Sequence, residues 1–311
     1  MATIILVHGI DNEQLTPDGV EAEWLPALAG GVRLAGRTDL ADRLWPPRSR
    51  PDAIESRSAY YGDLFRTPDQ QGGSLDLGEL DPEQESFAEE LALEWLERIA
   101  ERAPASSADG AQARFALDLA RNPEQVEAQG IGNIKRQILR TLARNSWLAR
   151  VGMSVAERFV RTALMQVTRY LSDELIRTLA QQRVLDLVQD DTRVIVGHSL
   201  GSVVAYECAH RLTQPLPLLL TLGSPLGLRT IVTDRLRPPP SFPPRVVRWT
   251  NVADRDDVVA AEPDLCPLFT HDSPESSRFD GVLVDNGSDP HNPCYYLGKE
   301  TVGKAIGEAL V

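Results

Sequence analysis

The segment Gly197–Gly201 reads Gly-His-Ser-Leu-Gly, and it lies between the apolar run Val194–Val196 and a stretch of helix-forming residues. A serine nucleophile must project from a sharp strand-to-helix turn, and that turn requires residues without bulk on both sides. Gly197 and Gly201 meet this requirement. The following helix would also direct its free N–H groups and its dipole toward a developing negative charge. We therefore predict that Ser199 is a nucleophile.

Acyl transfer at such a serine needs hydrogen-bond donors for the oxyanion of the tetrahedral intermediate. We expect the backbone N–H of Leu200, the residue after the nucleophile, to be one donor. The second should come from the loop after an earlier strand. Residues 3–7 are apolar and β-branched and lead into His8-Gly9-Ile10, so the N–H of Ile10 is the favoured second donor. A plain strand-ending turn is the alternative. We expect His8 itself to be structural.

A serine hydroxyl also needs a base, and the base needs an orienting carboxylate. On an elbow of this kind the acid and then the base follow the serine along the chain. His291 lies in a loop between the last expected strand and the final helix, which favours it as the base. His271, in an earlier loop, is the alternative. His210 falls in the helix after the nucleophile, where we expect a surface residue.

Several aspartates could orient that base. Asp257 directly precedes the apolar pair Val258–Val259, which could anchor it, and it is the favoured acid. Asp254 is the next candidate, although we expect both Asp254 and Asp256 to be solvated or bonded to turn amides. Asp285, after the last strand, is a further alternative.

The elements that would position these residues alternate between strand and helix. Strands are expected over 3–7, 58–61, 193–196, 216–222, 246–251 and 281–284. This alternation predicts an α/β fold whose mostly parallel sheet is covered by helices on both faces. Residues 66–170 interrupt it with a helical block too long for one crossover. We expect a core formed by residues 1–65 and 171–311, with residues 66–170 inserted as a helical cap or lid.

Together these motifs resemble the lipase and serine-esterase branch of the α/β-hydrolases. The resemblance covers about residues 1–65 and 170–311 and does not include the helical insert. It implies a Ser199–Asp257–His291 triad, an oxyanion hole at Ile10 and Leu200, and an α/β-hydrolase sheet reduced at the N-terminus. The motifs that carry it are Val7-His8-Gly9, Gly197–Gly201, Leu222-Gly223-Ser224-Pro225, Asp257-Val258-Val259 and His291.

The composition limits the classes of function. The formal charge of −13 over 311 residues disfavours a general nucleic-acid role. Three cysteines are too few and odd in number for a disulfide framework, which favours a reducing compartment. The N-terminus lacks the features of a secretory signal, and no apolar stretch approaches the ~18 residues of a membrane span. We expect a cytoplasmic protein without stable membrane insertion.

The insert is expected to decide the substrate. Residues 131–179 carry nine basic side chains and few acidic ones (Lys135, Arg136, Arg140, Arg144, Arg150, Arg158, Arg161, Arg169 and Arg177). A lid that contacts lipid, an acyl chain or an anionic protein partner is one interpretation. A packed cap with a solvated basic face is the favoured alternative.

The sequence thus predicts a serine hydrolase that cleaves carboxylic esters of a small molecule or lipid through an acyl-enzyme, with no metal or organic cofactor. A thioesterase, a peptidase or a non-catalytic protein-binding module on the same fold remains an alternative.

Overall fold

The structure is a computed structural model of the 311-residue chain. It describes residues 3–45, 51–66, 80–104, 107–122, 138–144, 153–232, 235–260 and 262–311. These residues belong to two compact units. The core unit comprises Met1–Arg66 and Asp173–Val311, and the helical unit comprises Thr67–Ser172. Sequence reasoning placed the two boundaries at 65/66 and 170/171.

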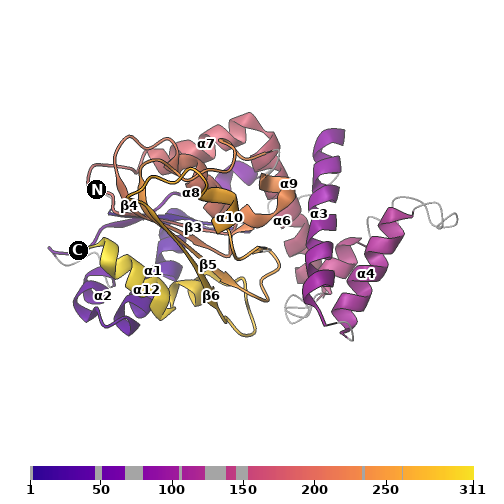
Figure 1. Cartoon of the computed structure of the whole chain (residues 1–311), viewed down its shortest axis with the longest axis horizontal. Coiled ribbons are helices and arrows are strands. Elements are labelled where there is room, and N and C mark those ends of the chain that lie inside the picture. The colour runs from indigo at the N-terminus through magenta and orange to yellow at the C-terminus, as the bar shows by residue number, and fades with distance from the viewer. Residues whose placement is uncertain are drawn as a thin grey trace. The chain divides into compact units, whose positions relative to one another are not determined.

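A six-stranded parallel sheet, in the order β2-β1-β3-β4-β5-β6, organises the core unit (Figure 1). The expected α/β class with a parallel sheet is therefore confirmed. The strands are β1 (Ile4–Val7), β2 (Ser56–Ser58), β3 (Val194–His198), β4 (Leu216–Leu222), β5 (Val246–Asp254) and β6 (Arg278–Val284).

The chain reverses its direction of travel across the sheet beside β1. It passes from β1 outward to β2, and then returns to place β3 on the other side of β1. In the register of this sheet Ile4 is paired with Ser56 on one side and with Val194 on the other. Such a switch point opens a crevice at the carboxyl ends of the two diverging strands, where open α/β sheets bind their ligands. Here those ends carry Gly9 and Ser199.

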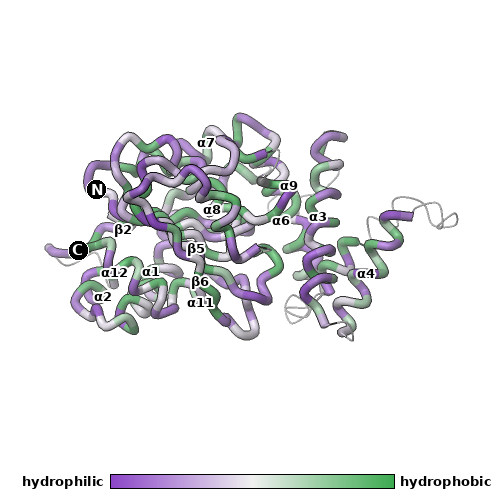
Figure 2. The backbone as a smooth tube through the Cα atoms, in the orientation of Figure 1, coloured by the Kyte–Doolittle hydropathy of each residue, from purple (hydrophilic) through white to green (hydrophobic). Residues whose placement is uncertain are grey.

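Helices cover both faces of the sheet (Figure 1). One face packs on α1 (Pro17–Leu34), α2 (Thr38–Leu44), α11 (Pro293–Leu297) and α12 (Glu300–Ala309). The other face packs on α8 (Leu200–Ala209), with α7 (Glu174–Leu185) against it. Every residue of α8 is buried, and its tube is mostly apolar in Figure 2. Burial on both faces explains why the central strands are continuous apolar runs rather than alternating ones.

Short helices complete the core unit: η1 (Gly62–Phe65), η5 (Pro225–Gly227), α9 (Arg229–Val232) and α10 (Cys266–Phe269). The sequence pattern did not predict α2, which buries only Leu40, Ala41 and Leu44. A seven-residue helix contains too few turns to give a clear periodicity.

Three strands begin or end three residues away from their expected bounds, and one of them, β5, continues to Asp254 instead of ending at 251. The second strand was expected over 58–61, but β2 spans Ser56–Ser58, and the N–H of Tyr61 donates to Nε2 of His8. The last strand begins at Arg278 instead of 281, since residues 278–280 already pair with Arg248, Trp249 and Thr250 of β5.

The helical unit contains α3 (Pro82–Arg102), α4 (Ala108–Arg121) and α6 (Met153–Ser172). A capping box between Asp81 and Gln84 begins α3. The unit contains a mainly apolar pocket, lined by Leu80, Glu85, Ala88, Glu89, Ala92, Ile138, Leu139 and Leu164. Among the residues that the structure describes, no helix is long and apolar enough to span a bilayer.

The basic segment 131–179 is divided between the helical unit and the core unit. Lys135, Arg136 and Arg150 lie outside the described residues. Arg140 lies 3.9 Å from Glu157 within the helical unit. Arg177 belongs to the core unit, where it is buried and pairs with the carboxylate of Glu207 at 2.8 Å. Arg177 is therefore a core ion pair and not part of a solvated basic face.

Candidate active site

Ser199 lies on a strained turn between the end of β3 and the start of α8. Its backbone has φ 53° and ψ −130°, a conformation that residues other than glycine rarely adopt. The residue is buried, with 3% of its surface exposed. Its N–H donates to the Leu222 carbonyl at 3.0 Å, and its carbonyl accepts the Ser202 N–H at 2.9 Å. The predicted elbow is thus a backbone feature of this structure.

Steric contacts exclude side chains at Gly197 and Gly201, the two glycines of the motif. A Cβ on Gly201 would lie 2.2 Å from the carbonyl oxygen of Val7, and one on Gly197 would lie 2.5 Å from the carbonyl oxygen of Gly201. Both distances are far shorter than any real Cβ contact. The helix α8 therefore approaches β1 and β3 closely only because these residues lack side chains.

The loop after β1 lies directly against the nucleophile. A Cβ on Gly9 would lie 2.6 Å from Cβ and 3.2 Å from Oγ of Ser199. Ile10 follows Gly9 and is 7% exposed, while Leu200 is the first residue of α8. The N–H groups in the first turn of a helix have no acceptor within that helix. The two predicted oxyanion donors thus lie in segments that flank Ser199, and their role stays a prediction.

Side chains fix the shape of that loop. Nδ2 of Asn12 donates to the Ile10 carbonyl at 2.7 Å, and the hydroxyl of Tyr60 donates to the Asn12 carbonyl at 3.2 Å. His8 Nε2 accepts the Tyr61 N–H at 3.1 Å, so Nδ1 carries the proton and donates to the Gly9 carbonyl at 2.8 Å. Burial lowers the pKa of His8 to about 4, although that bond to Gly9 opposes the shift. His8 is a neutral structural residue here.

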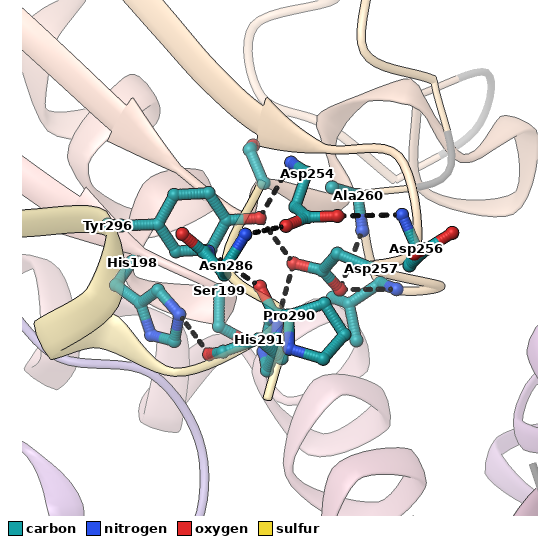
Figure 3. A network of polar contacts seen from close by, with 12 residues as sticks. His198, Ser199, Asp254, Asp256, Asp257, Ala260, Asn286, Pro290, His291 and Tyr296 are labelled. Atoms are coloured by element: carbon teal, nitrogen blue, oxygen red, sulfur yellow. Dashed lines mark hydrogen bonds and ion pairs between the residues drawn. The ribbon is translucent and has the colours of Figure 1, made fainter. Parts of the chain in front are cut away.

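The structure brings His291 and Asp257 together. Nδ1 of His291 lies 2.8 Å from Oδ2 of Asp257, and both side chains are buried (Figure 3).

The alternative residues do not take part in this pair. His271 is exposed and contacts its neighbour Asp272, and the Asp285 carboxylate accepts the N–H of Gly287. His210 is half-buried against the ring of Tyr206 rather than on the surface, and does not take part in this pair.

Asp257 is held as a carboxylate by donors on both oxygens. Oδ1 accepts the N–H groups of Val259 at 3.0 Å and Ala260 at 3.4 Å. Oδ2 accepts the Tyr296 hydroxyl at 2.8 Å in addition to His291. Burial alone would raise the pKa of Asp257, but the charge of His291 and the hydrogen bonds from His291 and Tyr296 outweigh it and lower that pKa. Asp257 is therefore an ionised partner for a histidine.

Asp254 is bonded to backbone amides, which was one of the two expectations for it, and it is buried rather than solvated. Its Oδ1 accepts the Asp256 N–H at 2.8 Å, and its Oδ2 accepts the N–H of Asn286. Nδ2 of Asn286 in turn donates to the Pro290 carbonyl at 2.9 Å, one residue before His291. Burial raises the pKa of Asp254 despite these backbone bonds. Asp254 thus anchors the loop that carries His291.

The surroundings of Gly223 explain why the Leu-Gly-Ser-Pro motif at the end of β4 contains a glycine. It has φ 52°, and a Cβ there would lie 2.8 Å from Oδ2 of Asp257 and 3.2 Å from Nδ1 of His291. The residue before it, Leu222, bonds to Ser199. The strands β3, β4, β5 and β6 are adjacent in that order, so the segments that follow their carboxyl ends place Ser199 near the His291–Asp257 pair (Figure 3).

His198, the variable residue of the motif, is a functional candidate that sequence reasoning did not identify. Its Nε2 lies 2.9 Å from the His291 carbonyl oxygen, and the two rings are 4.7 Å apart. Burial, with a smaller contribution from His291, lowers the pKa of His198 to about 3. The ring is therefore neutral near pH 7, and Nε2 must be the donor because a carbonyl can only accept. Its place before Ser199 was visible in the sequence, but its partner was not.

Tyr296, whose hydroxyl donates to Asp257, was also not identified from the sequence, because a tyrosine on a short helix 39 residues from that aspartate carries no local signal.

Among the residues that the structure describes, no group of three or more His, Cys, Asp and Glu side chains is placed to hold a metal ion.

Comparisons of this chain with protein-family models, with curated proteins and with solved structures found no match.

Proposed function

We propose that this protein is a serine hydrolase of the α/β-hydrolase type that cleaves carboxylic esters through an acyl-enzyme. The observation that carries the proposal is the strained conformation of Ser199 at the switch point of the sheet, beside the buried His291–Asp257 pair. Strain of this kind persists only where the surrounding structure enforces it, and it is concentrated at functional sites.

In the proposed mechanism, His291 removes the hydroxyl proton of Ser199 as Oγ forms a bond to the ester carbonyl carbon. The carbonyl oxygen becomes an oxyanion and accepts hydrogen bonds from the N–H groups of Leu200 and Ile10. Collapse of this intermediate breaks the bond to the alcohol, which takes the proton from His291. In the second half of the reaction, His291 removes a proton from a water molecule whose oxygen attacks the acyl carbon. The bond to Oγ then breaks, Ser199 takes the proton back from His291, and the acid is released. Asp257 stabilises the imidazolium in both halves of the reaction.

The helical unit is proposed as the cap that selects the substrate. Its apolar pocket supports an acyl chain or another apolar group as part of the substrate, because that lining offers dispersion contacts and few hydrogen bonds. A protein partner for this unit is the alternative that a binding experiment would reveal. A cytoplasmic location is also proposed, since Cys208, Cys266 and Cys294 are free thiols.

The test is reaction with a fluorophosphonate probe, followed by peptide mapping and by assays with short p-nitrophenyl esters. We expect labelling on Ser199 and ester hydrolysis by the wild type, with both lost in Ser199→Ala. Ser276→Ala, which removes an exposed hydroxyl from a loop, is the control and should react normally.

Other outcomes would redirect the proposal. Labelling at Ser199 with hydrolysis of thioesters or amides but not of esters would replace the substrate class. The absence of labelling, with intact folding, would instead favour a protein-binding module without catalysis.

A further inference from the structure

The hydroxyl of Tyr296 contacts the carboxylate that a serine–histidine–aspartate triad already uses. Tyr296 lies on α11 and is fully buried. Its hydroxyl lies 2.8 Å from Oδ2 of Asp257, the same oxygen that His291 contacts (Figure 3). Orientation of His291 by Asp257 does not require a second donor on that oxygen, so the role of Tyr296 needs its own explanation.

The direction of this hydrogen bond is fixed by the backbone. The N–H of Asp254 donates to the Tyr296 hydroxyl at 2.9 Å, and an amide N–H can only donate. The hydroxyl therefore accepts from Asp254 and directs its own proton to Asp257. Burial, and then the charge of Asp257, raise the pKa of Tyr296 well above its usual value, so the hydroxyl keeps that proton throughout the working pH range.

The consequence concerns the protons of the pair. With Tyr296 donating to Oδ2 and two amides donating to Oδ1, Asp257 presents acceptors only. Nδ1 of His291 must then carry the proton that joins it to Asp257, which leaves Nε2 as the basic nitrogen. A carboxylate that could rotate or take up a proton would not enforce this tautomer.

We propose that Tyr296 is a positioning residue that holds Asp257 as an ionised, oriented acceptor and thereby fixes His291 in the tautomer of a general base. This inference rests on the proposed function for its catalytic consequence, but the hydrogen-bond relationship can be measured without catalysis.

Other titratable groups also surround the pair. His198 contacts His291 from the end of β3, and His8 acts on His198 from the end of β1. Asp254 and Asp256 lie on the same turn as Asp257. His198 and His8 are neutral, and a Tyr296→Phe substitution changes none of these side chains, so its effect isolates the hydroxyl.

The main variant is Tyr296→Phe, which removes one oxygen and keeps the buried ring. Without this donor, Oδ2 carries more negative charge and favours the protonated form of His291. We expect the acidic limb of the pH profile for fluorophosphonate labelling to move to higher pH by about half a unit. The limiting rate should fall by about tenfold, because the Asp257 carboxylate without this donor can rotate and no longer holds the ring of His291 in one orientation. For an ester substrate the decrease should appear in kcat with KM unchanged, because the hydroxyl is buried.

Tyr295→Phe is the matched control. Tyr295 precedes Tyr296 on α11 and is 46% exposed, so the same oxygen is removed from the same helix without touching Asp257. Its pH profile and rates should equal those of the wild type.

A second measurement does not depend on activity. In the Ser199→Ala background, the Nδ1 proton of His291 is observed by proton NMR. We expect Tyr296→Phe to move this resonance downfield, because Asp257 then binds the Nδ1 proton more strongly. Replacement of Tyr296 by 3-fluorotyrosine, a stronger donor, should move it upfield. Opposite shifts from the two replacements are not expected from a role in packing alone.

These readouts separate the two proposals. If Ser199 is never labelled but the resonance moves as described, the proposed function fails and Tyr296 still orients the pair. If Ser199 is labelled but Tyr296→Phe leaves both the pH profile and the resonance unchanged, the proposed function stands and the role of Tyr296 is wrong. A lower melting temperature with no change in either readout would likewise overturn it.

Discussion

His291 and Asp257 are in hydrogen-bond contact at 2.8 Å although 34 residues separate them in the chain. The contact exists because β5 and β6 are adjacent and parallel, so the segments that follow their carboxyl ends meet at one edge of the sheet. Neither residue has an exposed side chain, and this burial strengthens the electrostatic interaction between them.

The first prediction concerns this pair. Asp257→Asn replaces an acceptor by a group that can donate, which favours the wrong tautomer of His291. Labelling at Ser199 and ester hydrolysis should fall by about a thousandfold or more, as in other triads that lose the acid. Asp256→Asn in the same turn is the control, since Asp256 is exposed, and it should retain most activity. Equal losses in the two variants would contradict the assignment of Asp257.

A second prediction concerns the bond from His198 to the backbone of His291. His198→Leu removes the donor and should lower the rate of labelling by about tenfold, the effect of one buried hydrogen bond. His198→Gln places an amide N–H near the position of Nε2 and should recover part of that loss. If the leucine and glutamine variants behave alike, the hydrogen bond does not position His291.

A third prediction uses Gly223. Gly223→Ala should reduce labelling strongly, because the new Cβ would lie 2.8 Å from Oδ2 of Asp257. Gly36→Ala is the matched control: Gly36 also has positive φ, at 78°, but a Cβ there meets nothing within 4 Å. Both variants should lose about 1 kcal/mol of stability from backbone strain, measured by urea unfolding. Only the variant at 223 should lose activity and further stability.

A fourth prediction concerns the pH dependence of folding. The folded pKa values of His8 and His198, about 4 and about 3, lie below the ordinary histidine pKa of about 6.5. Below about pH 6.5 the unfolded chain binds more protons than the folded one, so stability falls with acidification until the folded values are reached. Each residue contributes a slope of about 1 kcal/mol per pH unit in that range.

His198→Gln tests this slope, because glutamine cannot take up the proton. Urea unfolding at pH 7, 6 and 5 should show that the variant loses less stability with acidification than the wild type, by about 1 kcal/mol per pH unit. Parallel curves for the two proteins would indicate that His198 is not neutral when folded.

Much of this site could be predicted because its constraints are local. The strain at Ser199 and the two glycines beside it arise within five consecutive residues, and apolar runs that are buried on both faces identify parallel strands. The favoured residues Asp257 and His291 do come together, but the sequence left Asp254, Asp285 and His271 open, since each also follows or precedes an expected strand.

The sequence by itself determined the strand-to-helix elbow at Ser199 and the class of the fold, because backbone conformation and hydrophobic pattern depend on neighbouring residues. Only the tertiary structure decided which aspartate contacts His291, what His198 and Tyr296 bind, and that Arg177 is a buried partner of Glu207. These choices depend on which strand ends are adjacent and on a few ångströms of separation. Hydrogen bonds and ion pairs of this length are set by the packing of distant segments, and residue spacing along the chain does not encode them.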